Sequence, residues 1–197
     1  MAILISADDI KKELPGYTPD RAGEFHTESA KIADKRFEEQ LKSGGYTTVI
    51  LMSGGSASGK TEYVSEYLLD QHVLILDGVL PTENGAGIKI RNVRKTKKNL
   101  VVHAVWPHDL KQAYIAFLHR DRKFDDAYFF EKHASARATL LWIATEYPDI
   151  EIQIIESVYR DDDLTFTKLA FESHEARVAY IRKNQYTRNE IANAVLE

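Results

Sequence analysis

A glycine-rich stretch near residue 55 constrains this chain more than any other part of its sequence. The apolar run 49–52 leads into this stretch, and a helix-like segment follows from Tyr63. The stretch reads Gly54-Gly55-Ser56-Ala57-Ser58-Gly59-Lys60-Thr61. The pattern G-x-x-x-x-G-K-[ST] between a strand and a helix is the P-loop, or Walker A motif, which holds the phosphates of a nucleotide. The flanking strand and helix weaken the alternative of a Gly/Ser loop that only turns the chain.

The residue types of this loop suit a polyphosphate. Glycines let the backbone turn its N–H groups inward, and the following helix N-terminus also favours negative charge. Lys60 is expected to reach the β- and γ-phosphates, and the Thr61 hydroxyl to ligate Mg²⁺. We therefore predict that ATP or GTP binds with Mg²⁺ to these eight residues: Gly54, Gly55, Ser56, Ala57, Ser58, Gly59, Lys60 and Thr61.

Composition bounds the class of protein. The 197 residues, 44% apolar and 28% charged, are typical of one ordinary globular α/β domain. The formal net charge of −4 argues against a nucleic acid as a general partner, because such binding needs a basic surface. The chain has no cysteine, which excludes disulfides and thiolate metal sites. With neither a membrane-length apolar run nor a signal-peptide pattern, the expectation is a cytoplasmic protein without a membrane partner.

Apolar runs of strand length alternate with helical patterns along the rest of the chain. We expect helices at about 6–14, 27–42, 88–98, 109–118, 126–146 and 175–196, and further strands at 73–76, 100–105, 150–156 and 165–171. Ser43-Gly44-Gly45 would end the second helix, Pro81 to Gly87 would be a loop, and the strand 150–156 would lie near an edge. This alternation predicts a three-layer P-loop fold, with a mainly parallel sheet of about five strands and helices on both faces.

We expect residues 1–197 to form one domain in three parts. Residues 1–45 would be an N-terminal helical extension, and 158–197 a C-terminal one. Residues 46–157 would be the nucleotide-binding core, with a lid near 119–125. A lid over the γ-phosphate would exclude water and limit hydrolysis of the donor.

Phosphoryl transfer needs a carboxylate and additional cations beside the phosphates. Asp77 ends a predicted strand, where open α/β sheets place their ligand crevice, and would act on Mg²⁺ or on the acceptor hydroxyl. The alternative is that Asp77 only forms a strand-ending turn. Arg120 and Arg122 are the candidate lid cations and Arg137 a weaker third, although basic residues also suit helix C-termini for electrostatic reasons.

A polar cluster marks the start of the second predicted helix. His26 and Glu28, with two nearby hydroxyls, are candidates for binding a polar acceptor. The simpler interpretation is a helix start capped by Thr27, with Glu28 in the first turn. The other histidines show no metal-ligand spacing and are interpreted as ordinary surface or core residues.

Taken together, these motifs resemble the zeta-toxin group of P-loop kinases. The similarity rests on the P-loop, on Leu76-Asp77-Gly78, on the strand 101–105, on Arg120 and Arg122, and on an H-x-E-[SA]-like run at 26–30. It implies a nucleoside-kinase type of fold, ATP or GTP as donor, a sugar nucleotide such as UDP-N-acetylglucosamine as acceptor, and an antitoxin-like protein partner. In the toxins, however, the H-x-E-[SA] helix follows the P-loop, whereas here it precedes it. Their D-x-[FY]-R strand end after the P-loop helix is also missing.

The leading hypothesis is therefore a kinase that transfers a γ-phosphate to a hydroxyl of a small molecule. A nucleotide-binding regulatory ATPase that acts through a protein partner is the first alternative. A polynucleotide kinase is the second, which the acidic balance disfavours despite a basic segment at 89–98. Labelled ATP that yields only inorganic phosphate across many acceptors would count against the kinase.

Overall fold

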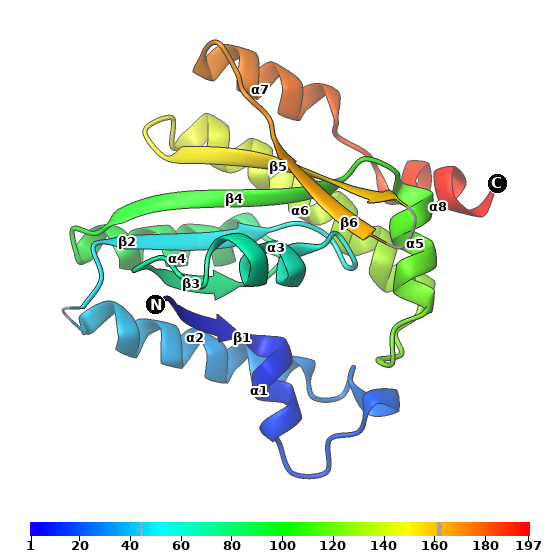
Figure 1. Ribbon diagram of the computed structural model, residues 1–197, viewed down its shortest axis with the longest axis horizontal. Helices are drawn as coiled ribbons and strands as arrows, with labels where there is room; N and C mark the ends of the chain where they lie inside the picture. Colours follow the sequence, from blue (N-terminus) through cyan, green and yellow to red (C-terminus); the bar gives the residue numbers. More distant parts are fainter. Residues whose placement is uncertain (44, 161–162) are drawn as a thin grey trace.

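The computed structural model describes residues 1–43, 45–160 and 163–197. Its centre is a six-stranded sheet with the order β1-β3-β2-β4-β5-β6 (Figure 1). The strands are β1 (Ile3–Ser6), β2 (Thr48–Ser53), β3 (Leu74–Asp77), β4 (Asn99–Pro107), β5 (Glu151–Arg160) and β6 (Asp163–Lys168). β1 to β5 pair in parallel, and β6 is antiparallel to β5. The carboxyl ends of five strands therefore lie at one edge of the sheet.

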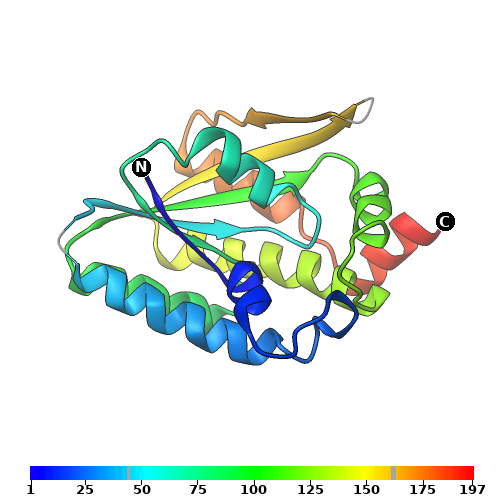
Figure 2. The ribbon, with the colours of Figure 1, turned by 60° about the horizontal axis from the view of Figure 1, so that its bottom comes forward.

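Helices cover both faces of this sheet. They are α1 (Ala7–Glu13), α2 (His26–Lys42), α3 (Lys60–Tyr67), α4 (Glu83–Lys95), α5 (Leu110–Leu118), α6 (Asp126–Glu146), α7 (His174–Lys183) and α8 (Arg188–Leu196), with a 3-10 turn at Pro19–Arg21. Figure 2 shows α2 and α6 below the sheet and α3 above it. The predicted three-layer α/β arrangement is confirmed.

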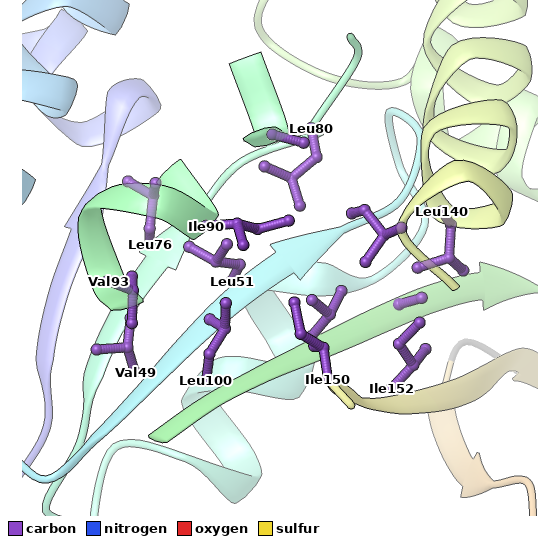
Figure 3. Close-up of a cluster of buried hydrophobic side chains, with 14 of the residues drawn as sticks. Val49, Leu51, Leu76, Leu80, Ile90, Val93, Leu100, Leu140, Ile150 and Ile152 are labelled. Carbon is purple, nitrogen blue, oxygen red and sulfur yellow. The ribbon is translucent and has the colours of Figure 1, made fainter. Parts of the chain in front are cut away.

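The core follows from the alternation of side chains along the strands. On β2, Val49 and Leu51 pack with α2, α4 and α6, whereas Ile50 and Met52 pack with α3 on the opposite face. Figure 3 shows the first of these clusters, where the side chains of several strands meet Ile90 and Leu140 from the helices. Strands buried on both faces read as continuous apolar runs, which is why the sequence indicated them clearly.

The N-terminal part departs most from the prediction. Residues 1–45 are not only a helical extension, because β1 pairs with β3 and forms the edge of the sheet (Figure 1). With four residues, β1 is too short to give a clear periodic pattern, and it raises the expected five strands to six. Ser6 nevertheless caps α1 as predicted, accepting a hydrogen bond from the Asp9 N–H.

Three local predictions change as well. Thr27 does not cap α2, which begins at His26 without a side-chain cap. The predicted loop 81–87 already contains the start of α4, capped by Thr82. The last predicted helix is two helices, α7 and α8. β5 does lie near an edge of the sheet, next to the edge strand β6. Of the predicted helix stop at 43–45, Gly44 lies outside the described residues; α2 ends at Lys42.

Within the described residues, none of the helices combines the length and the apolar character needed to cross a membrane.

Candidate active site

The P-loop connects β2 to α3 in a backbone path that requires glycine. Gly54 and Gly59 have φ angles of 139° and 85°. A Cβ atom at Gly54 would lie 2.3 Å from the Val105 carbonyl oxygen, which belongs to the neighbouring strand β4. A larger residue would therefore push the loop away from the sheet. Ala57, with φ 56°, adopts the left-handed region without being glycine, at a cost of about 1 kcal/mol or more.

Three side chains from outside the loop hold it by hydrogen bonds to its backbone carbonyl groups. The Ser157 hydroxyl donates to the Ser58 carbonyl at 2.8 Å, and the Tyr159 hydroxyl donates to the Ala57 carbonyl at 3.2 Å. On the other side, His133 Nε2 lies 2.8 Å from the Ser56 carbonyl. β5 and α6 thus hold the loop by its carbonyl oxygens, while phosphate binding in such loops uses the N–H groups.

His133 is a structural residue of the site that the sequence did not reveal. Burial lowers the pKa of His133 to about 3, so the ring is neutral and Nε2 carries the proton that it donates to Ser56. A Cβ atom at Gly55 would lie 2.3 Å from this ring. No local pattern marks a histidine whose partner lies 77 positions away in the sequence.

Lys60 extends back along the loop. Its Nζ donates to the carbonyls of Gly54 at 2.9 Å and Gly55 at 2.8 Å. Burial lowers the pKa of Lys60, and Asp77 opposes that shift. A phosphate entering the loop would supply the counter-charge that this buried ammonium group requires.

A cavity of about 350 Å³ opens beside the loop, at the carboxyl ends of β1, β2 and β3. Open parallel sheets place their ligands at this position. The cavity brings together most of the predicted site residues, namely Ser56, Ser58, Lys60, Thr61, Asp77, Arg120, Arg122 and His26. It is therefore the candidate active site.

Two predicted residues outside the P-loop do not line this cavity. Glu28 is exposed on α2 and lies outside its lining. Arg137 lines a different cavity and is not a lid cation. His26 does line the active-site cavity, with its ring edge against Tyr128 at a centroid distance of 6.0 Å. Its buried Nδ1 has no partner among the described residues.

Asp77, at the end of β3, lies next to the last residue of the P-loop. Its Oδ2 accepts a hydrogen bond of 3.5 Å from the Thr61 hydroxyl. Burial raises the pKa of Asp77 to about 6, although Lys60 works in the opposite direction. Hydroxyl and carboxylate oxygens are the ligands that Mg²⁺ prefers, and in P-loop proteins one or two of them suffice because the phosphates supply the others. Thr61 and Asp77 fit that donor set. Within the described residues, no cluster of three or more acidic or histidine side chains offers another metal site.

Asp8 is the second carboxylate of the cavity, and the sequence analysis missed it. It follows β1, whose last residue, Ser6, pairs with Asp77 of β3. Asp8 Oδ2 pairs with Arg122 Nη1, and its Oδ1 accepts from Lys11 Nζ at 3.0 Å. Burial disfavours its charge, but the two cations hold the pKa of Asp8 well below its usual range. Its place in the cavity depends on the pairing of β1 with β3, which no sequence pattern indicated.

The two arginines predicted for a lid, Arg120 and Arg122, have different surroundings. Arg122 is 22% exposed at the side chain and paired with Asp8, which raises its pKa against the effect of burial. Arg120 makes no ion pair with any described residue, and burial lowers its pKa, with Arg122 adding to the effect. Both line the cavity. Arg120 is therefore available to a phosphate, whereas Arg122 is already bound to an acid.

The comparisons with known proteins agree with the fold. No protein-family model and no curated protein matches the sequence. The solved structures of similar fold include a crystal structure of AvrRxo1-ORF1:-ORF2 with ATP and one of AvrRxo1-ORF1:AvrRxo1-ORF2 with sulphate ions. The first has a TM-score of 0.53 and 11% identity, covering 87% of this chain and 74% of the other. The second has a TM-score of 0.52 and 11% identity, covering 88% and 75%. At this identity the likeness concerns the fold alone.

Proposed function

We propose that this protein is a phosphotransferase that moves the γ-phosphate of ATP or GTP to a hydroxyl of a small molecule. One observation carries the proposal. The P-loop opens into a cavity that is also lined by the carboxylates of Asp8 and Asp77 and by Arg120, an arginine without an acidic partner among the described residues. A protein that only binds a nucleotide needs the loop but not this arrangement beside the γ-phosphate position. The solved structure of similar fold with ATP supports a nucleotide in this fold.

The proposed reaction forms one bond and breaks one bond. The acceptor hydroxyl oxygen bonds to the γ-phosphorus, and the bond from that phosphorus to the β–γ bridging oxygen breaks, which releases ADP or GDP. The hydroxyl proton passes to Asp8, which its two cations keep ionised and fixed in position. Because the transition state of phosphoryl transfer is loose, position matters more here than the strength of the base.

The cations of the site stabilise the charge that moves during transfer. Lys60 would contact the β- and γ-phosphates, and Arg120 the γ-phosphate oxygens, while Arg122 orders the lid through Asp8. Thr61 and Asp77 would hold Mg²⁺, which neutralises phosphate charge when bound. His26 would contact the acceptor, because its unpartnered Nδ1 belongs to a ring lining the same cavity.

The position of Asp8 also bears on the resemblance to the zeta toxins. In those kinases, the strand-end aspartate and the H-x-E-[SA] helix both follow the P-loop. Here Asp8 and the run beginning at His26 keep that mutual order but precede it. We propose that residues 1–42 correspond to that part of the toxins, moved ahead of the P-loop. A sugar nucleotide such as UDP-N-acetylglucosamine is then the first acceptor to test.

The direct test incubates the protein with Mg²⁺ and ATP labelled at the γ-phosphate, together with UDP-N-acetylglucosamine and a panel of sugars and nucleosides. A labelled phosphate ester should form with the native protein and be lost in Lys60→Ala. Lys31→Ala, a lysine exposed on α2, is the matched control and should keep full activity. Label recovered only as inorganic phosphate with every acceptor would overturn the proposal.

A second candidate is a regulatory ATPase that acts through a protein partner. It is favoured by one observation: the two AvrRxo1 structures described above contain ORF2 beside AvrRxo1-ORF1. This function becomes the proposal if the transfer assay yields inorganic phosphate and no phosphate ester. In that case, ATP should change the amount of partner protein that co-purifies with the native chain but not with Lys60→Ala.

A further inference from the structure

A second cavity of about 380 Å³ lies away from the P-loop and shares no lining residue with the first. It is formed at the carboxyl end of β4 and beside the middle of β5, between the start of α5, the middle of α6 and the segment joining α7 to α8. Its lining includes Trp106, Arg137, Tyr180 and Tyr186. The proposed phosphoryl transfer uses none of these residues.

Arg137 is the unusual feature of this cavity. The residue is 4% exposed, and its guanidinium carbon lies 4.3 Å from the ring centroid of Trp106 and 5.1 Å from that of Tyr186. Its Nη1 donates to the Asn184 carbonyl at 2.9 Å. Its Nε has no partner among the described residues, and neither does Nε1 of Trp106, which is also 4% exposed.

No carboxylate of the described residues pairs with this arginine. The two acids in the cavity wall are already engaged: Glu156 Oε1 lies 3.2 Å from His108 Nδ1, and Asp109 caps α5 by accepting from two backbone N–H groups. Burial lowers the pKa of Arg137 to about 10, with Tyr186 and Tyr180 acting in the opposite direction. A buried cation without an anion is costly, and aromatic rings compensate it only in part.

One further cation lies in the wall of this cavity. Lys111 lines it from the first turn of α5, whose first N–H groups are already bound by Asp109. The side chains of Trp106, Tyr180 and Tyr186 also line the cavity, and Arg137 and Trp106 are both buried there. A buried surrounding strengthens a contact between an oxyanion and a guanidinium group.

We propose that this second cavity is a binding site for a small oxyanion, a phosphate or a carboxylate, with Arg137 as its counter-ion. The ligand accepts hydrogen bonds from the guanidinium group and supplies the charge that the protein does not. The site is separate from the nucleotide site, so its occupant is neither the donor nor the acceptor of the proposed reaction.

Trp106 provides the test, because the chain has only two tryptophans. In the variant Trp142→Phe, Trp106 is the only fluorescent indole; Trp142 packs elsewhere, against Tyr147. Titration of this variant with sodium phosphate and, separately, with sodium acetate should give a saturable change with at least one of them. Sodium chloride at equal ionic strength should give none. Phosphate also suits the P-loop, so the same response must persist when Lys60→Ala is added.

The double variant Trp142→Phe/Arg137→Gln should bind the responding anion at least about tenfold more weakly, since a charge-assisted hydrogen bond is lost. Should Arg137→Gln fail to fold, the Nε–H resonance of Arg137 can be followed by ¹⁵N NMR in the unmutated chain, and it should shift along the same titration curve. A fluorescence response that is absent for both anions, or unchanged without Arg137, would overturn the proposal.

Discussion

The donor and acceptor sides of the candidate active site are built in opposite ways. The donor side is eight consecutive residues between β2 and α3, held by their own backbone path and by contacts from β5 and α6. The acceptor side is assembled from Asp8, His26, Asp77, Arg120 and Arg122, which lie far apart in the sequence. A contiguous motif fixes the chemistry of the donor side, whereas the fold alone decides which side chains meet on the acceptor side.

This difference implies that substitutions on the two sides should separate binding from transfer. Changes in the P-loop should affect nucleotide binding and transfer together. Changes on the acceptor side should leave nucleotide binding nearly intact and affect transfer alone, because those groups act on the γ-phosphate or the acceptor. The following predictions run from the largest expected effect to the smallest.

The largest contrast is between Lys60→Ala and Asp8→Asn. Lys60→Ala should reduce phosphate transfer by about 10³-fold and also weaken ATP binding, because a buried cation on the phosphates is lost. Asp8→Asn should reduce transfer by about 10²-fold or more while the Kd for ATP changes by less than about threefold. Calorimetry and the labelled-ATP assay measure the two effects. Equal losses of ATP binding in both variants would show that the two sides are not separable.

The lid arginines should differ by about tenfold. Arg120→Ala should lower kcat by about 10²-fold, because Arg120 is free to contact the transferring phosphate. Arg122→Ala should lower it by about tenfold, since Arg122 acts through its ion pair with Asp8. Single-turnover kinetics of each variant would measure the two rate losses. The opposite ranking would mean that Arg122 leaves Asp8 and contacts the phosphate.

The protonation of Asp77 should make phosphate transfer depend on pH. Because its pKa is raised to about 6, kcat/KM should fall roughly tenfold per pH unit below pH 6, where the protonated carboxyl no longer suits Mg²⁺. The stability effect has the opposite sense. The folded state holds this proton more tightly than the unfolded state, so Asp77 destabilises the fold increasingly as pH rises from about 4 to about 6.

Asp77→Asn should therefore be inactive yet more stable than the native protein at pH 7, by roughly 1–3 kcal/mol, with little difference below pH 4. Denaturant titrations at pH 4 and pH 7 would measure the difference. A variant that is less stable at pH 7 would contradict the burial that raises this pKa.

Gly55 probes the packing of the donor side, and Gly78, which lies outside it, serves as the control. Gly55→Ala places a Cβ atom 2.3 Å from the His133 ring, so we expect a loss of roughly 1–3 kcal/mol in the free energy of unfolding and weaker ATP binding. Gly78→Ala is the matched control, because nothing lies within 4 Å of its added Cβ atom. Urea denaturation compares them. Equal stability of the two variants would mean that His133 moves without cost.

The sequence predicts the contiguous features of the molecule well and the features assembled from distant segments poorly. The buried strands and the strand–loop–helix path around residues 54–61 are local features of the sequence, and the structure confirms them. β1, Asp8 and His133 were missed because their roles depend on strand pairing and on contacts between distant segments. Glu28 and Arg137 were assigned to the site by residue type, but the faces of α2 and α6 place them elsewhere.

The fate of the γ-phosphate is the measurement that tests the account most directly. We would follow ³¹P NMR spectra of the native protein with Mg²⁺, ATP and a mixture of hydroxyl-bearing metabolites. The account predicts a new phosphate-ester resonance that grows in step with ADP while little inorganic phosphate forms. With Lys60→Ala, no phosphate-ester resonance should appear. Growth of inorganic phosphate in step with ADP, without any ester, would contradict it.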